Sequence, residues 1–157
     1  MSYFTSNLVI EEIGYERWRI ARPFSFHSDL GLIIHVEAGF ETELASIPPI
    51  ARAFVPKMGY WSQPAAVHDV CYWGHRNNVQ VAINMDTGEY VDIDRAMADK
   101  LLRNGCEAKE LEYDIPLYKQ RTLTIYAGVL AGGLSSWETN AEKADRMAGI
   151  SYNEDLV

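Results

Sequence analysis

The chain has 157 residues, 48% hydrophobic and 23% charged, the composition of an ordinary globular domain with its own core. Its net charge of -8 argues against a nucleic-acid partner, because contacts to phosphate backbones need clustered Lys and Arg. We see no secretory signal and no apolar run of the ~20 residues that a transmembrane helix needs, so we expect a chain made in the cytoplasm with no transmembrane segment.

The first third of the chain predicts a small antiparallel sheet. Residues 8–13 and 17–21 flank a Gly-Tyr step, and the apolar residues of 17–21 alternate with arginines, which is the period of half-buried strands. Residues 31–39 predict a further strand. Residues 40–56 contain a Pro-Pro step and predict a structured connection that leaves the sheet.

A helix is expected next, over the stretch PAAVHDVCYW. Ser62 or Gln63 can cap its start, and Pro64 suits the first helical position, where no amide donor is required. Gly74 is the expected end of this helix.

Residues 79–93 predict a β-hairpin around an Asp-Thr-Gly turn, between two runs of residues that favour strands. A second helix is expected to start at Asp92 or Asp94 as N-cap and to end at Gly105. A third helix is expected from about residue 116 to residue 132.

The predicted fold class is α+β: a small N-terminal antiparallel sheet packed on two to three helices, with a β-hairpin insertion. We expect residues 1–134 to form a single domain. Residues 135–157 are polar and acidic, and predict a short helix followed by a loose tail.

Two neighbouring residues in the first helix, His68 and Asp69, suggest a site. Burying a charge is costly unless the charge is paired, so a His-Asp step in an apolar helix needs solvent, a partner or a function. Tyr72 lies four residues after His68 and shares its face. Asp99, in the second helix, is the best candidate to orient His68 as a general base, if the two helices pack together.

Alternatives without chemistry remain open for the same residues. Asp99 lies four residues from both Arg95 and Arg103, so solvated ion pairs would also account for it. A lone helical histidine is often a hydrogen-bonded packing residue, and Tyr72 can be a plain core aromatic.

Metal binding has weaker support. His68, Cys71 and His75 share one helical face, but no second pair of ligands completes a zinc site. Asp69 with backbone carbonyls could hold calcium, although no Asp-rich loop accompanies it. Cys71 and Cys106 are expected as two reduced thiols.

The stretch from residue 39 to residue 75 resembles the phage and prophage family known as domain of unknown function 1353. That family runs Gly-Phe-x-Thr-Asp-Leu-Ala-Ser-Val/Ile-Pro, then a Gly-Tyr step, then Ala-x-x-His-Asp-x-x-Tyr. The positions that match it are Gly39, Phe40, Thr42, Leu44, Ala45, Ser46, Ile47, Pro48, Gly59, Tyr60, Ala65, His68, Asp69 and Tyr72. The resemblance extends over roughly residues 8–132, and Glu43 stands where the family usually has Asp.

The resemblance implies a bacteriophage origin, synthesis in the host cytoplasm and incorporation into the virion beside other virion proteins. A looser similarity links the His-Asp-x-Cys-Tyr helix to secreted phospholipases A2. By that analogy His68 is the base, Asp69 a calcium ligand, and Asp94 or Asp99 the orienting group. The glycine-rich calcium loop and the disulfides of those enzymes are missing here.

Two functions are therefore expected. The first is a virion-associated structural or assembly protein of the tail, baseplate or head-tail region, in which the polar cluster locks a loop onto the helices. The alternative is a hydrolase, phospholipase A2-like or directed at the cell wall, with a membrane or cell-wall substrate and calcium or zinc as candidate cofactors. Its candidate catalytic residues are Glu43, Ser46, His68, Asp69, Tyr72 and Asp99. An enclosed cluster favours the first function and an open pocket the second.

Overall fold

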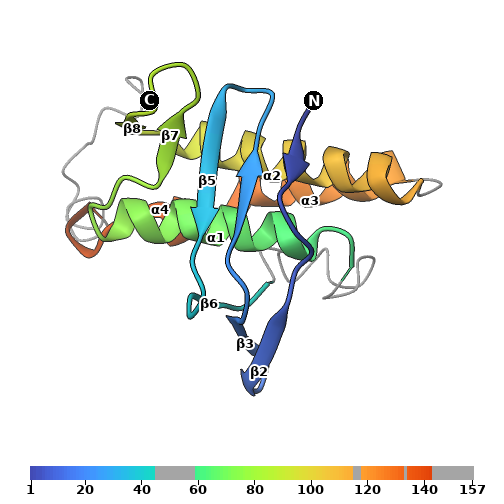
Figure 1. The fold of residues 1–157 in the computed structure, drawn as a ribbon. Coiled ribbons are helices and arrows are strands. Elements are labelled where there is room, and N and C mark those ends of the chain that lie inside the picture. The colour runs from blue at the N-terminus through green and yellow to red at the C-terminus, as the bar shows by residue number, and fades with distance from the viewer. Residues whose placement is uncertain (45–58, 115–117, 133, 143–157) are drawn as a thin grey trace.

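A computed structural model describes residues 1–44, 59–114, 118–132 and 134–142 (Figure 1). It confirms the α+β class, with antiparallel strands in two sheets and four helices among these residues. The strands are β1 (Tyr3–Phe4), β2 (Ile10–Gly14), β3 (Arg17–Ile20), β4 (Phe24–His27), β5 (Leu32–Val36), β6 (Glu41–Thr42), β7 (Ala82–Asn84) and β8 (Tyr90–Val91). The helices are α1 (Ser62–Arg76), α2 (Arg95–Tyr113), α3 (Tyr118–Gly132) and α4 (Leu134–Trp137).

The larger sheet has five strands in the order β1-β4-β5-β7-β8. Figure 1 shows this sheet in front of the helices, which cover only its rear face. The expected hairpin at 79–93 is present as β7 and β8, and it pairs with β5 instead of standing apart from the sheet. Strands β1 and β4 were not predicted, because runs of two and four residues carry too little pattern.

The smaller sheet consists of β2, β3 and β6. The expected pair of strands at 8–13 and 17–21 is confirmed as the antiparallel hairpin of β2 and β3. Strand β6 adds to β3 through Trp18 opposite Thr42. The end of β6 is thereby fixed next to the start of the stretch that leads to α1.

The core lies between the five-stranded sheet and the helices. One row of side chains crosses the sheet on its rear face, and we call it the rear row: the paired residues Phe4, Phe26, Ile34, Ala82 and Val91. The middle three are fully buried, and they pack in one cluster with apolar residues of α1 and α2. The side chains one residue along each strand point to the open face and are partly or fully exposed.

Helix α1 does not begin or end as predicted. Its N-cap is Trp61, whose side chain makes no capping bond, and Pro64 occupies the third helical position. A proline is tolerated there because the first four amides of a helix have no partner within it. The helix continues past Gly74 to Arg76. A Cβ atom on Gly74 would lie 2.7 Å from the Val79 carbonyl oxygen, so this glycine allows the following chain to pass close by.

Helix α2 starts as predicted, with the Asp94 carboxylate accepting a bond from the Met97 amide at 2.7 Å. The predicted end at Gly105 is wrong, because α2 continues to Tyr113 and is capped by Asp114 in a left-handed conformation. Gly105 marks instead the crossing with α1, where an added Cβ would lie 3.0 Å from the Cβ of Pro64.

Helix α3 lies within the range expected for the third helix, and α4 follows it. Among the described residues, no helix is both long and apolar enough to span a bilayer. The predicted loose tail lies mostly in residues 143–157, outside the described residues. The expected division into residues 1–134 and 135–157 stays a prediction.

Candidate functional site

His68 and Asp99 meet at the interface of α1 and α2. His68 projects from the middle of α1, and its Nε2 lies 2.7 Å from the Oδ1 atom of Asp99 on the first turns of α2. His68 is 2% exposed and Asp99 is fully buried. The predicted contact is therefore confirmed, and the solvated ion pairs considered for Asp99 are excluded.

Tyr72 completes the group that we call the His68 network: His68, Tyr72 and Asp99. The Tyr72 hydroxyl donates to the same Oδ1 atom at 2.7 Å, and the rings of His68 and Tyr72 lie 4.1 Å apart. Burial, followed by the hydrogen bond to Asp99, raises the pKa of Tyr72, so the phenol stays a proton donor. One carboxylate oxygen thus holds two residues that lie one turn apart on α1.

The second oxygen of Asp99 differs from the first. Oδ2 is buried and has no hydrogen-bond partner within the part of the chain that the structure describes. A buried carboxylate oxygen without a partner is costly. Such an atom is also one of the features found at sites that bind or transfer a proton.

A second contact ties the sheet to α1 next to this network. The Thr42 hydroxyl donates to Asp69 Oδ2 at 2.5 Å and accepts a bond from the Leu44 amide at 3.0 Å. Leu44 is fully buried and has a positive φ of 54°, unusual for a leucine. Asp69 therefore holds Thr42 in place at the sharp bend that follows β6, within the family motif of residues 39–75.

The other predicted site residues are placed differently. Glu43 is exposed, and Thr42, one residue before it, makes the contact to Asp69. Ser46 lies outside the described residues. The structure therefore brings together His68, Tyr72 and Asp99, with Asp69 on the adjoining side of α1, and their catalytic roles stay predictions.

A comparison with protein-family patterns matched residues 18–129 to the family described as protein of unknown function DUF1353. The chain belongs to the DUF1353 family. Neither the curated proteins nor the solved structures gave a match to it.

The DUF1353 match runs from β3 to α3 and so contains the whole His68 network and its neighbour Asp69. Strands β1 and β2 precede the match, and α4 follows it. One contact of the network comes from outside: the Trp137 ring packs edge-on against Tyr72 at 5.0 Å. Trp137 also stacks on His75 at 4.1 Å, so α4 closes one side of the network in this DUF1353 member.

Two residues that contact this site in the DUF1353 chain were not predicted from the sequence as site residues. Thr42 was among the matching positions, but its contact with Asp69 depends on how β6 meets α1. Trp137 is far from Tyr72 in sequence and carries no motif. No local signal could have placed it there.

Metal binding gains no support from the described part of this DUF1353 chain. No group of three or more His, Cys, Asp or Glu residues that could hold a metal ion is present among the described residues. Asp69 uses one oxygen to accept the Thr42 bond, and Asp99 accepts two bonds on one oxygen. The calcium and zinc predictions therefore stay untested.

The Cys71 thiol should resist alkylation in the folded protein. It is buried, and burial, with the charges of Asp69 and Asp99, raises its pKa from 9.0 to about 12. The thiolate is the reactive form, so iodoacetamide at pH 8 should label this residue only after unfolding. Peptide mass spectrometry of native and urea-treated protein would measure this.

The same shift predicts loss of stability in alkali. A raised pKa in the folded state means that the contribution to stability is complete below pH 9 and is lost as the pH rises through about 12. A Cys71→Ala variant should lose less stability over this range than the wild type. For the labelling prediction above, rapid labelling of native Cys71 at pH 8 would contradict the enclosure of this thiol.

Proposed function

We propose that this protein is a virion-associated structural or assembly protein of a bacteriophage or prophage, and that the His68 network is a structural bond between its first two long helices. The observation that carries the structural role is burial combined with bonding. His68, Tyr72 and Asp99 are 2%, 4% and 0% exposed, and the first two share one carboxylate oxygen of the third. Satisfied buried polar groups specify one packing of a core; both donors of this network are satisfied, and Oδ2 of Asp99 is the one oxygen of its carboxylate without a partner among the described residues.

The residues that surround the His68 network support a structural role for it rather than a catalytic one. A general base must come within hydrogen-bond reach of the proton that it removes from the substrate. Here α2 covers His68 from one side, and Trp137 packs on Tyr72 from another. Cys71, a potential nucleophile three residues after His68, is buried, and its raised pKa keeps the thiol protonated and unreactive.

The phage context rests on the family resemblance. The tail, the baseplate and the head-tail region are the locations we propose, with other virion proteins as partners. A structural protein of a particle needs a rigid fold more than an open cleft. Bonds that join β6 to α1 and α1 to α2 give this chain such rigidity.

One observation favours a second function, a hydrolase acting on phospholipid or cell wall. An imidazole held at 2.7 Å by a buried carboxylate is the geometry of an oriented general base. Asp69, partly exposed beside it, would be the candidate calcium ligand. In this function, Asp99 orients His68 and a movement of the covering residues admits the substrate.

Three measurements test the proposal together. Mass spectrometry of purified particles from a strain that carries the gene should detect the chain at a fixed ratio to other virion proteins. The purified protein should release no product from phospholipid vesicles or peptidoglycan, with calcium, zinc or chelator. A His68→Ala variant should lose thermal stability, because the Asp99 carboxylate loses a donor.

The comparison variant is His75→Ala on the same helix. It removes the stacking on Trp137 but none of the bonds to Asp99, and His75 is partly exposed, so we expect a smaller loss of stability. Turnover by the wild type that His68→Ala abolishes, with the fold intact, would establish the hydrolase instead. Absence of the chain from purified particles would overturn the virion role.

A further inference from the structure

The open face of the five-stranded sheet carries a continuous row of apolar and aromatic side chains. Each member of this row is paired with the next across neighbouring strands, from β1 to β8. We call it the front row, and its members are Tyr3, His27, Ile33, Ile83 and Tyr90. Side chains alternate along strands, so the front row lies on the face opposite the rear row, and the helices cover the rear face (Figure 1). A role for the open face is therefore independent of the proposed function.

The composition of the front row is unusual for a solvated face. Antiparallel sheets with one open side normally alternate apolar residues inward with polar residues outward. Here Tyr3 is 51% and Tyr90 56% exposed, and Ile33 and Ile83 between them are partly exposed. An uncharged row across all five strands is therefore left in contact with water.

The order of the side chains indicates what covers them. The centre of the row is aliphatic and its two ends carry tyrosine, which is how protein interfaces are built, with an apolar centre and amphipathic aromatics towards the rim. A ring platform for sugars or bases would continue its aromatic side chains through the middle, where Ile33 and Ile83 stand. The net charge of -8 further disfavours a polyanionic partner.

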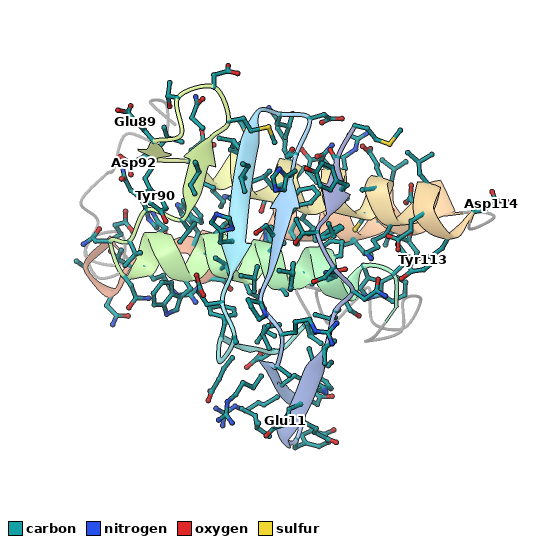
Figure 2. All side chains as sticks on the ribbon, viewed as in Figure 1. Glu11, Glu89, Tyr90, Asp92, Tyr113 and Asp114 are labelled. Atoms are coloured by element: carbon teal, nitrogen blue, oxygen red, sulfur yellow. The ribbon has the colours of Figure 1, made fainter. Side chains whose placement is uncertain are left out.

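The two ends of the row also differ in the hydrogen-bonding groups that lie near them. His27 lies on β4 and its ring stacks on Tyr3 at 4.7 Å, whereas His35 on the central strand β5 bonds through Nδ1 to the Ser25 hydroxyl at 2.5 Å. At the other end, Figure 2 shows Glu89, Asp92 and Tyr90 near one another at the β8 edge. The His27 imidazole thus lies towards one end of the front row, and two carboxylates lie near the other end.

We propose that two copies of this chain pack face to face through the front row, related by a two-fold axis near Ile33. When this axis lies between the two sheets and runs parallel to β5, it places each end of the row over the opposite end of the partner's row. Tyr3 of one copy then lies over Tyr90 of the other, and His27 lies over Ile83, beside the β8 edge, where Glu89 or Asp92 accepts from the His27 imidazole. Two-fold contacts of this kind bury the same patch on both copies, and aligned sheets pack ~10 Å apart.

The acidic residue nearest in sequence to His27 does not oppose this contact. Asp29 lies two residues after His27, and its Oδ1 accepts a bond from the Asn104 side chain of α2 at 2.8 Å. That carboxylate is turned towards the helices, so the imidazole end of the front row keeps its complement to Glu89 and Asp92.

Sedimentation equilibrium of the full chain over a range of concentrations tests the proposal. The wild type should reach a monomer-dimer equilibrium. An Ile33→Lys or Ile83→Lys variant should weaken the dimer by more than about tenfold, because a charge is placed at the centre of an apolar contact. The double variant Glu89→Lys with Asp92→Lys should weaken it less, by an amount that added salt reduces.

The matched control uses apolar residues that are exposed elsewhere. Leu123 and Leu130 lie on α3, and replacing either with Lys should leave the dimer unchanged. If the isoleucine variants lose their circular-dichroism signature, Tyr90→Glu at an exposed rim position provides the same test. A wild type that stays monomeric at all concentrations overturns the proposal, and so does a dimer that only the α3 variants break.

Discussion

Replacing Asp99 with alanine should lower the free energy of unfolding by about 3 to 5 kcal/mol, because two buried donors lose their shared acceptor. His68 Nε2 and the Tyr72 hydroxyl both lie 2.7 Å from the Oδ1 that this change removes. Neither group can turn to solvent, since both are almost completely buried. Urea denaturation followed by circular dichroism would measure the loss.

Two variants make this result specific to the network. Asp99→Asn keeps one acceptor oxygen for both donors and should retain most of the stability. Glu107→Ala, further along α2, removes only an exposed ion pair with Arg103 and should cost less than about 0.5 kcal/mol. Equal losses for Asp99→Ala and Glu107→Ala would mean that the network contributes nothing to folding.

A Phe26→Ala variant should also cost about 3 to 5 kcal/mol, for a different reason. Phe26 is one of the three fully buried residues of the rear row, and its ring stacks on Phe4 at 4.6 Å. Removing it leaves a cavity between the sheet and the helices in addition to the lost apolar contact. Thermal unfolding followed by calorimetry would measure the effect.

The neighbouring residue supplies the control, because strands alternate their faces. His27 follows Phe26 on β4 but projects to the open face. His27→Ala should therefore leave the free energy of unfolding of the monomer within about 1 kcal/mol of the wild type. A large loss of unfolding free energy for His27→Ala with a small loss for Phe26→Ala would mean that the two faces of the sheet are assigned the wrong way round.

Some elements of this fold could be read from the sequence because their signals are local. The β2-β3 hairpin follows from alternation, and the start of α2 follows from Asp94 as a capping residue. Glycines were harder to interpret. Gly74 and Gly105 look like helix ends, yet both lie inside helices where a neighbouring segment passes too close for a side chain.

The candidate site likewise contains some contacts that the sequence predicted and others that it could not predict. Helical spacing predicted that His68 and Tyr72 share a face, and the apolar setting of Asp99 predicted its partner. The contact of Thr42 with Asp69 could not be predicted, because it depends on the bend after β6. The packing of Trp137 on Tyr72 depends on tertiary structure alone.

The position of Trp137 sets a condition on how the chain matures during synthesis. Its ring lies over Tyr72 and His75 on α1, some sixty residues earlier in the chain, a separation that follows from their numbers. While the ribosome is still adding α2 and α3, that side of α1 has no cover and offers its aromatic surface to chaperones or to other nascent chains. The most vulnerable period of this protein therefore lasts until residue 137 has left the exit tunnel.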